Sequence, residues 1–219
     1  MTLTEALTLR RSVRSYQETP IAPDALAALQ QEIACINRET GLHIQLITEE
    51  PKAFDCFLAH YGHFSGVRNY FALVGKKSAD LQEICGYYGQ RLVLLAQELG
   101  LNTCWVALTY KRVPGTITVD KGEKLAVVIS VGYGTTQGSP RKSKTAQQVS
   151  DVQPDDPDWY KAGIEGALLA PTAVNQQKFR ITRKGDEVFF MALPGPYSRM
   201  DLGIVKYNFE IASGRRVIP

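Results

Sequence analysis

The stretch 125–131 reads Leu-Ala-Val-Val-Ile-Ser-Val and is apolar at nearly every position. A run this short and this apolar predicts a central strand that is covered on both faces. Helical patterns surround it, and the clearest one carries Leu92, Leu95 and Leu99 on one face and stops at Gly100. Together these signals predict an α+β fold in which mixed sheets are flanked by helices.

Composition limits the classes of protein that this chain can belong to. It has 219 residues, of which 44% are hydrophobic, so it can bury a sizeable core. The net charge of +3 is balanced, and no basic stripe interleaved with aromatic residues indicates a nucleic-acid partner. No stretch approaches the roughly 18 to 20 apolar residues that span a bilayer, and the N-terminus lacks the apolar core of a signal peptide. We therefore expect a cytoplasmic protein that does not enter the membrane.

A polar connector divides the chain into two parts. Residues 138–158 are rich in Ser, Lys, Gln, Asp and Pro, which is typical of an exposed linker. The predicted halves are residues 1–145 and 146–219, packed as one unit. A helix, a strand and a long apolar helix recur in this order in 23–100 and in 158–214, so the two halves are predicted to be related and to form a pseudo-dimer.

The cysteines do not indicate a metal or dithiol centre. The four are Cys35, Cys56, Cys85 and Cys104, and none stands in a Cys-x-x-Cys pair. We expect them to be reduced and packed. Cys56, His60 and His63 fall at helical spacing and could be metal ligands, but a fourth ligand is not apparent. No metal site is predicted.

An arginine-rich segment follows a short N-terminal helix that Thr2 and Glu5 can begin as a capping box. Its phosphate-binding candidates are three guanidinium groups and a hydroxyl: Arg10, Arg11, Ser12 and Arg14. Arginine forks match phosphate oxygens in pairs and remain charged, so the segment suits a phosphate group. Alternatively, basic residues at the end of a helix only complement its dipole.

A second candidate segment, 169–179, combines a helix stop with amide side chains. Pro171 should end the preceding helix near Ala170. Asn175, Gln176 and Gln177 then offer donors and acceptors, which suit the carbonyl and imide edge of a flavin. The alternative is a helix end followed by an ordinary polar loop.

These two segments resemble motifs of the FMN-dependent nitroreductase family. Residues 10–16 match its Arg-Arg-Ser-x-Arg-x-aromatic start, and 171–177 match its Pro-Ser/Thr-x-x-Asn-x-Gln stretch. Further matches lie at 100–106, 127–134 and 141–144, so the resemblance extends over nearly the whole chain. It is closest to the branch called transmembrane-type nitroreductases, a name that this sequence does not support.

The resemblance implies bound FMN and assigns residues to it. Arg10 and Ser12 would hold the phosphate, with help from Arg11, Arg141 and Lys142. Arg14 would reach the N1 and O2 edge of the ring, where a cation stabilises the reduced flavin. The other expected cofactor-binding residues lie beside the ring or the ribityl chain: Trp105, Val106, Ala107, Pro171, Thr172, Ala173, Asn175 and Gln177.

The resemblance also implies an activity. NAD(P)H would deliver hydride to flavin N5 and leave, after which a nitroaromatic, a quinone or a similar small acceptor would be reduced in a ping-pong cycle. No side-chain acid or base is expected, since the flavin is the reactive group. Family members are typically homodimers with flavin between subunits. Because this chain carries both parts of such a site and lacks a long C-terminal arm, we expect a monomer with one FMN, with a homodimer as the alternative.

Two other classes of function remain open from the sequence. One is an FMN-binding sensor or storage module without turnover. The other is a non-enzymatic α/β interaction domain in which the arginine-rich segment binds an acidic partner.

Overall fold

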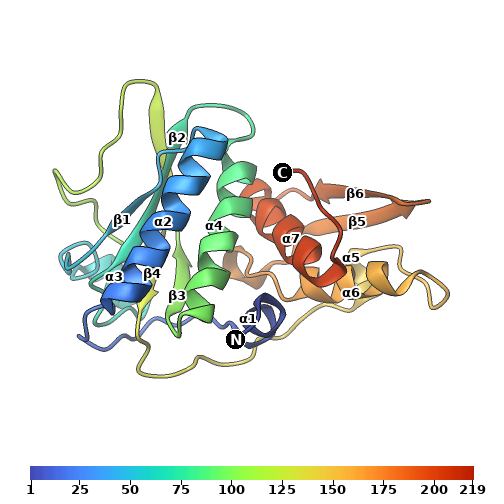
Figure 1. The fold of residues 1–219 in the computed structure, drawn as a ribbon, viewed down its shortest axis with the longest axis horizontal. Helices are drawn as coiled ribbons and strands as arrows, with labels where there is room; N and C mark the ends of the chain where they lie inside the picture. The colour runs from blue at the N-terminus through green and yellow to red at the C-terminus, as the bar shows by residue number, and fades with distance from the viewer. The chain divides into compact units, whose positions relative to one another are not determined.

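The computed structural model describes residues 1–219, and the chain divides into two compact units (Figure 1). Unit 1 comprises Met1–Leu9, Gln82–Arg91 and Pro140–Pro219, and unit 2 comprises Arg10–Leu81 and Leu92–Ser139. Each unit is described by itself below. The helix α4, Leu81–Glu98, contributes residues to both. The predicted division into 1–145 and 146–219 stays a prediction.

Unit 2 is built on a four-stranded sheet in the order β1-β2-β4-β3. The strands are β1 (Gln45–Ile47), β2 (Tyr70–Lys76), β3 (Asn102–Val106) and β4 (Glu123–Gly132). The central position predicted for 125–131 is confirmed, because β4 pairs with β2 on one side and with β3 on the other. The prediction of a mixed sheet is wrong, since all of these pairings are antiparallel.

One face of this sheet is covered by helices. Figure 1 shows α2 (Pro23–Thr40) and the part of α4 that belongs to unit 2, residues 92–98, lying in front of the strands. Proline in the first turn of α2 costs no intrahelical hydrogen bond. Gly41 ends the helix in the left-handed conformation, with φ of 70°, and its N–H donates to the carbonyl of Asn37. Both ends of α2 therefore coincide with residues that favour a helix start and a helix stop.

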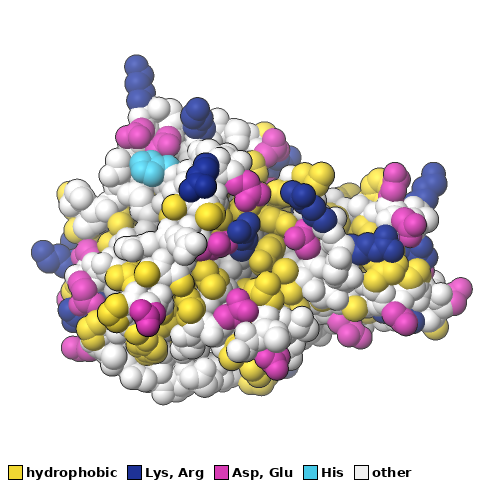
Figure 2. Space-filling model, in the orientation of Figure 1, with side chains coloured by type: hydrophobic (Ala, Val, Ile, Leu, Met, Phe, Trp, Pro, Cys, Tyr) yellow, Lys and Arg dark blue, Asp and Glu magenta, His cyan; other side chains and the backbone are white.

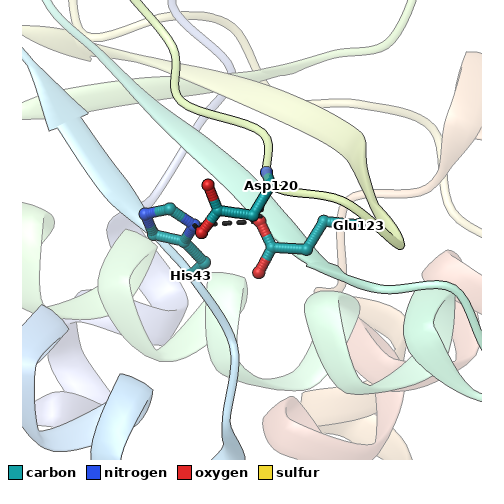
Figure 3. A group of neighbouring side chains, drawn as sticks. All are labelled: His43, Asp120 and Glu123. Atoms are coloured by element: carbon teal, nitrogen blue, oxygen red, sulfur yellow. Dashed lines mark hydrogen bonds and ion pairs between the residues drawn. The ribbon is translucent and has the colours of Figure 1, made fainter.

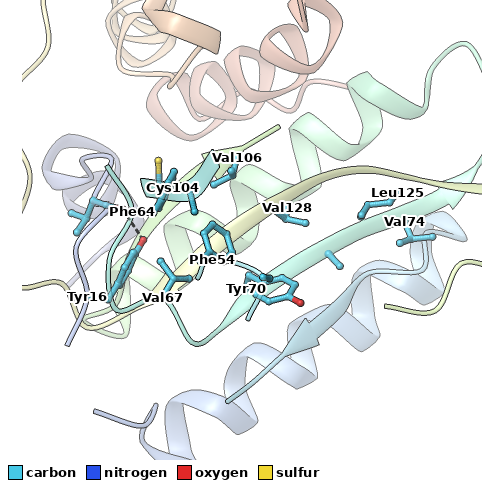
Figure 4. Packing of buried hydrophobic residues seen from close by; sticks show 14 residues of the cluster. Tyr16, Phe54, Phe64, Val67, Tyr70, Val74, Cys104, Val106, Leu125 and Val128 are labelled. Carbon is cyan, nitrogen blue, oxygen red and sulfur yellow. Dashed lines mark hydrogen bonds between the residues drawn. The ribbon is translucent and has the colours of Figure 1, made fainter. Parts of the chain in front are cut away.

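The opposite face of the sheet is covered by loops and by the short helix α3 (Phe57–Tyr61). Phe54, Phe64 and Val67 pack there against Tyr70 of β2 and Val128 of β4 (Figure 4). Phe54 contacts both aromatic neighbours, with ring centroids 5.3 Å from Phe64 and 5.7 Å from Tyr70. An antiparallel strand can therefore be apolar throughout, because irregular segments replace the second layer of helices expected beside a parallel sheet.

Unit 1 combines helices with a β-hairpin. Its elements are α1 (Leu3–Leu9), α5 (Ala146–Val149), α6 (Asp158–Leu168), the 3₁₀ turn η1 (Ala173–Asn175), β5 (Phe179–Lys184), β6 (Glu187–Ala192) and α7 (Ser198–Ser213). Phe209 of α7 packs edge-on against Phe190 of β6, with centroids 5.2 Å apart. Gly203 of α7 lies directly against the carbonyl of Glu83 in α4, so a side chain at this position would collide with the backbone.

The predicted pseudo-dimer is not evident. Both parts do contain a helix, two antiparallel strands and a helix in sequence order. However, β1 and β2 belong to the four-stranded sheet, whereas β5 and β6 form a separate two-stranded sheet. A repeated order of elements is therefore not accompanied here by a repeated sheet, because the order does not determine which strands pair.

The surface carries charges of both signs. Figure 2 shows Lys and Arg side chains interspersed with Asp and Glu side chains on the visible face. None of the helices has the length and apolarity needed to cross a bilayer.

Candidate functional site

The arginine-rich segment, defined as residues 10–16, is fixed along β3 in unit 2. The backbone N–H of Val13 donates to the carbonyl of Thr103 at 3.1 Å, and Ser12 pairs with Thr103 in a parallel bridge. The buried hydroxyl of Tyr16 donates to the carbonyl of Val13 at 2.7 Å and also bonds Ser130 Oγ of β4 at 2.8 Å. These contacts hold a segment without regular structure against the edge strand of the sheet.

The predicted phosphate-binding residues place positive charge beside β3. Arg10 is only 2% exposed, whereas Arg14 is exposed and its guanidinium lies 5.9 Å from the ring centroid of Phe64. Burial raises the pKa of the Cys104 thiol, while the positive charges of Arg14 and Arg10 and a hydrogen bond to Ser12 act to lower it. The side chains of Arg10, Ser12 and Arg14 are therefore all close enough to Cys104 of β3 to influence its thiol.

A turn after β4 packs closely on the same segment. A Cβ at Gly138 would lie 2.7 Å from Cβ of Arg11 and 3.1 Å from the carbonyl oxygen of Ser12, and its φ of 72° also favours glycine. Asn102, which is 3% exposed, accepts a 3.0 Å bond from the N–H of Gly134. Sequence reasoning did not single out Asn102, although it stands inside the matched stretch 100–106.

Three further predicted residues lie at or directly after the end of β3. Trp105 and Val106 pair with Ile129 and Val128 of β4, and Ala107 follows directly. The arginine-rich segment is attached to the same strand through Val13 and Thr103, and the role of these three residues beside the flavin stays a prediction. The sheet thus brings together the unit 2 candidates: Arg10, Arg11, Ser12, Arg14, Trp105, Val106 and Ala107.

The remaining predicted residues come together in unit 1, around a strained loop. We define the amide loop as residues 172–177, which follow Pro171 and the end of α6. Three of its residues have left-handed φ angles: Val174 at 45°, Asn175 at 54° and Gln177 at 45°. Asparagine tolerates this region, but a β-branched valine there is an outlier that costs of order 1–3 kcal/mol. Val174 is nevertheless 92% exposed.

Gln177 holds the amide loop to the connector that precedes α5. Its side chain is 2% exposed, and its Oε1 accepts bonds from the N–H of Lys144 at 2.9 Å and from Ser143 Oγ at 3.3 Å. Its Nε2 donates to the carbonyl of Lys142 at 3.2 Å and to Asn175 Oδ1 at 3.0 Å. The amide that the sequence suggested as a flavin reader is thus engaged within the protein.

Arg141 and Asn175 also bond to backbone carbonyls in unit 1. Arg141 Nη2 donates to the carbonyls of Leu168 and Ala170, each at 3.0 Å, at the end of α6. Asn175 Nδ2 donates to the carbonyl of Lys142 at 2.8 Å. Unit 1 therefore brings Arg141 and Lys142 together with Pro171, Thr172, Ala173, Asn175 and Gln177.

Sequence reasoning missed Asp201, a carboxylate of α7 that is 3% exposed. Its Oδ1 accepts the N–H of Ala173 at 2.9 Å, and its Oδ2 accepts Nε2 of Gln176 at 2.7 Å. Burial raises its pKa to about 6, and these two hydrogen bonds act to lower it. Only its position on the opening turn of the last helix was visible in the sequence, and that position does not indicate a contact with residues far earlier in the chain.

The metal-ligand candidates Cys56, His60 and His63 do not converge. All four cysteines are free. A different group in unit 2 does converge: His43 Nδ1 lies 3.0 Å from Glu123 Oε2 and 4.0 Å from Asp120 Oδ2 (Figure 3). The bond to His43 lowers the pKa of Glu123. This pair joins the residues before β1 to the start of β4.

The fold and these residues define a nitroreductase-like α+β protein. The sequence profile described as "Putative TM nitroreductase" matches residues 2–213, so the chain belongs to this family. The similar structure described as a putative nitroreductase comes from Thermotoga maritima, and the letters TM in the family description refer to that organism. The expansion of TM to transmembrane, expected from the sequence resemblance, is therefore wrong.

Solved structures agree on the fold. The Thermotoga maritima structure, described as a putative nitroreductase, is 21% identical with a TM-score of 0.70 and covers 97% of this chain and 83% of its own. A structure from Parabacteroides distasonis, described as a putative NADH dehydrogenase/NAD(P)H nitroreductase, is 23% identical with a TM-score of 0.51. It covers 68% of this chain and 97% of its own. No curated protein matches the chain.

Proposed function

We propose that this protein is an FMN-dependent oxidoreductase that transfers hydride from NAD(P)H to nitroaromatic, quinone or similar small acceptors. The observation that carries the proposal is the arginine-rich segment bound along β3, in a chain that belongs to a nitroreductase family. FMN supplies the redox chemistry when it is bound, and the protein supplies its position and its electrostatic environment.

The donors of unit 2 fit a phosphate group. Arg10, Arg11 and Arg14 offer guanidinium forks that remain charged, and Ser12 offers a hydroxyl beside them. Because position 138 is a glycine, no side chain from the turn after β4 crowds Arg11 and the backbone of Ser12. We assign phosphate binding to Arg10, Arg11 and Ser12, and we assign the N1 and O2 edge of the ring to Arg14.

Other residues are assigned to the ring and to its support. The backbone of Trp105, Val106 and Ala107 is proposed to face N5. Pro171, Thr172, Ala173 and Asn175 are proposed to contact the ring or the ribityl chain. Gln177 and the carbonyl of Lys142 are assigned mainly to holding the amide loop, and Arg141 to holding the end of α6 before it, since their bonds in unit 1 already serve these purposes. No side-chain acid or base is required.

The proposed assembly is a monomer with one FMN, and a homodimer found by light scattering would contradict this part of the proposal.

Comparing FMN with riboflavin tests the phosphate assignment, because the two ligands differ only in the phosphate. Flavin fluorescence titrations should show FMN binding much more tightly than riboflavin. Arg10→Lys keeps the charge but loses the fork, so FMN affinity should fall about tenfold while riboflavin affinity stays unchanged. Arg38→Lys on the exposed side of α2 is the matched control.

Three results would argue against the proposal. Equal affinities for FMN and riboflavin would contradict the assignment of phosphate binding to Arg10, Arg11 and Ser12. A protein that binds neither flavin would favour the interaction domain. Bound FMN that NAD(P)H does not reduce would favour the sensor or storage module.

A further inference from the structure

The strongest unassigned feature of unit 1 is the buried contact between α7 and the amide loop. Asp201 Oδ1 accepts the N–H of Ala173 at 2.9 Å, and Oδ2 accepts Gln176 Nε2 at 2.7 Å. Both oxygens of one carboxylate are thus used on the same short loop. Gln176 Nε2 also donates to the carbonyl of Pro196 at 2.7 Å, in the segment that leads into α7.

The loop needs such an anchor because its backbone is strained. Val174, Asn175 and Gln177 all adopt left-handed φ angles, and the side chain of Val174 is almost fully exposed. Strained conformations persist only where surrounding contacts fix them. Asp201 fixes the loop at Ala173 and at Gln176. Within the loop, Thr172 Oγ1 accepts the N–H of Gln177 at 3.0 Å and joins its two ends.

We propose that Asp201 is a positioning residue that holds the amide loop, residues 172–177, in the conformation that presents Asn175 to the flavin. The presentation to flavin rests on the proposed function. The anchoring itself does not, because it concerns contacts inside unit 1. Asp201 has no role in the reaction and acts only through the loop.

Burial makes this anchor sensitive to pH, and the charged groups on the elements around Asp201 are already paired, engaged with backbone carbonyls or directed to solvent. Lys206 of α7 pairs with Glu83 of α4, and Arg141 donates to carbonyls at the end of α6. Arg199 is two residues away on α7, and Glu165 of α6 is exposed. Burial is the main influence on the pKa of Asp201, which stands near 6 in place of 3.8.

The sign of the pH effect follows from linkage. Opening the loop to water returns the carboxyl toward its ordinary pKa, so a proton binds more tightly in the closed state. Protonation therefore favours the closed loop. Opening should become easier as pH rises from about 4 to about 6, by at most about 100-fold, and should level off above that.

Hydrogen exchange of the peptide covering 171–178 tests the anchoring in the flavin-free protein. Asp201→Ala should lower the protection factors of this peptide about 10- to 100-fold, whereas Asp201→Asn should retain most of the protection, because its amide oxygen can still accept the N–H of Ala173. Wild-type protection should fall between about pH 4 and 6, and Asp201→Asn should show no such dependence. Asp151→Asn, which alters another side-chain contact of unit 1, should leave the peptide unchanged.

Either of two results would overturn the anchoring. One is protection in Asp201→Ala within about twofold of wild type. The other is the same pH profile in wild type and Asp201→Asn. If Asp201→Ala does not fold, the pH profiles of peptide protection in wild type and Asp201→Asn still test the anchoring.

A second measurement separates this proposal from the proposed function. FMN affinity should fall about tenfold in Asp201→Ala and be restored in Asp201→Asn. If Asp201→Ala loses loop protection without any change in FMN affinity, Asp201 anchors the loop, but the claim that the loop presents Asn175 to the flavin is contradicted. Failure of the wild-type protein to bind FMN would contradict the proposed function and leave the exchange result standing.

Discussion

The N–H of Val13 donates to the carbonyl of Thr103 at 3.1 Å, and this bond attaches the arginine-rich segment to the edge strand β3. A basic segment at a helix end is ordinarily mobile and solvated. Here its backbone is hydrogen-bonded to the edge strand of the sheet, so the guanidinium groups extend from a backbone of fixed position. Preorganised donors bind an anion more tightly than mobile ones, because less conformational entropy is lost on binding.

Tyr16→Phe should loosen this attachment. The change removes the hydroxyl that bonds the carbonyl of Val13 and Ser130 Oγ in the buried core. The free energy of unfolding should fall by about 1–3 kcal/mol, because two buried polar groups lose a partner. Urea unfolding measures this change. Tyr133→Phe is the matched control, since the hydroxyl of Tyr133 accepts a long 3.4 Å bond from the N–H of Ala22. An equal loss in both variants would contradict the role given to Tyr16.

Arg14→Ala should lower the reduction potential of bound flavin. The exposed guanidinium is assigned to the ring edge that becomes negative on reduction. Losing one charged hydrogen bond of about 1.5 kcal/mol corresponds to about 30 mV for a two-electron couple. Equilibration with a reference dye measures the potential, and Arg112→Ala, another exposed arginine of unit 2, is the control. An unchanged reduction potential in Arg14→Ala would contradict the assignment of Arg14 to the N1 and O2 edge of the ring.

Asp201 should make folding stability depend on pH in mildly acid solution. Because burial raises its pKa to about 6 from 3.8, the folded state binds a proton that the unfolded state releases. Stability should therefore decrease as pH rises from about 4 to about 6, by no more than about 3 kcal/mol, and this contribution should be absent in Asp201→Asn. Unfolding midpoints across this range measure it. A wild-type contribution that grows with pH would reverse the assigned sign.

Much of the fold could be predicted because local signals were strong. The apolar run 125–131 gave the central strand, and Pro23 and Gly41 marked both ends of α2. The capping box of α1 is also confirmed, since the N–H of Thr2 donates to Glu5 Oε2 at 2.8 Å and the N–H of Glu5 donates to Thr2 Oγ1 at 3.2 Å. Each of these features depends on neighbours within one turn or one strand.

Strand direction and sheet membership could not be predicted, because they depend on contacts between distant segments. The continuous apolar run suggested a strand of a mixed sheet, but loops such as that around Phe54 cover the second face of an antiparallel sheet. The contact from Asp201 to Ala173 spans 28 positions. Asp201 looked like an ordinary acidic residue at a helix start, and Gln177 looked like a ligand-binding amide although its bonds are internal.

The most direct test of the central claim is the flavin absorption spectrum of the FMN-loaded protein under anaerobic conditions. Adding NAD(P)H should bleach the flavin bands, and adding a quinone or nitroaromatic acceptor afterwards should restore them. A spectrum that NAD(P)H leaves unchanged, in protein shown to hold FMN, would contradict the assignment as an oxidoreductase.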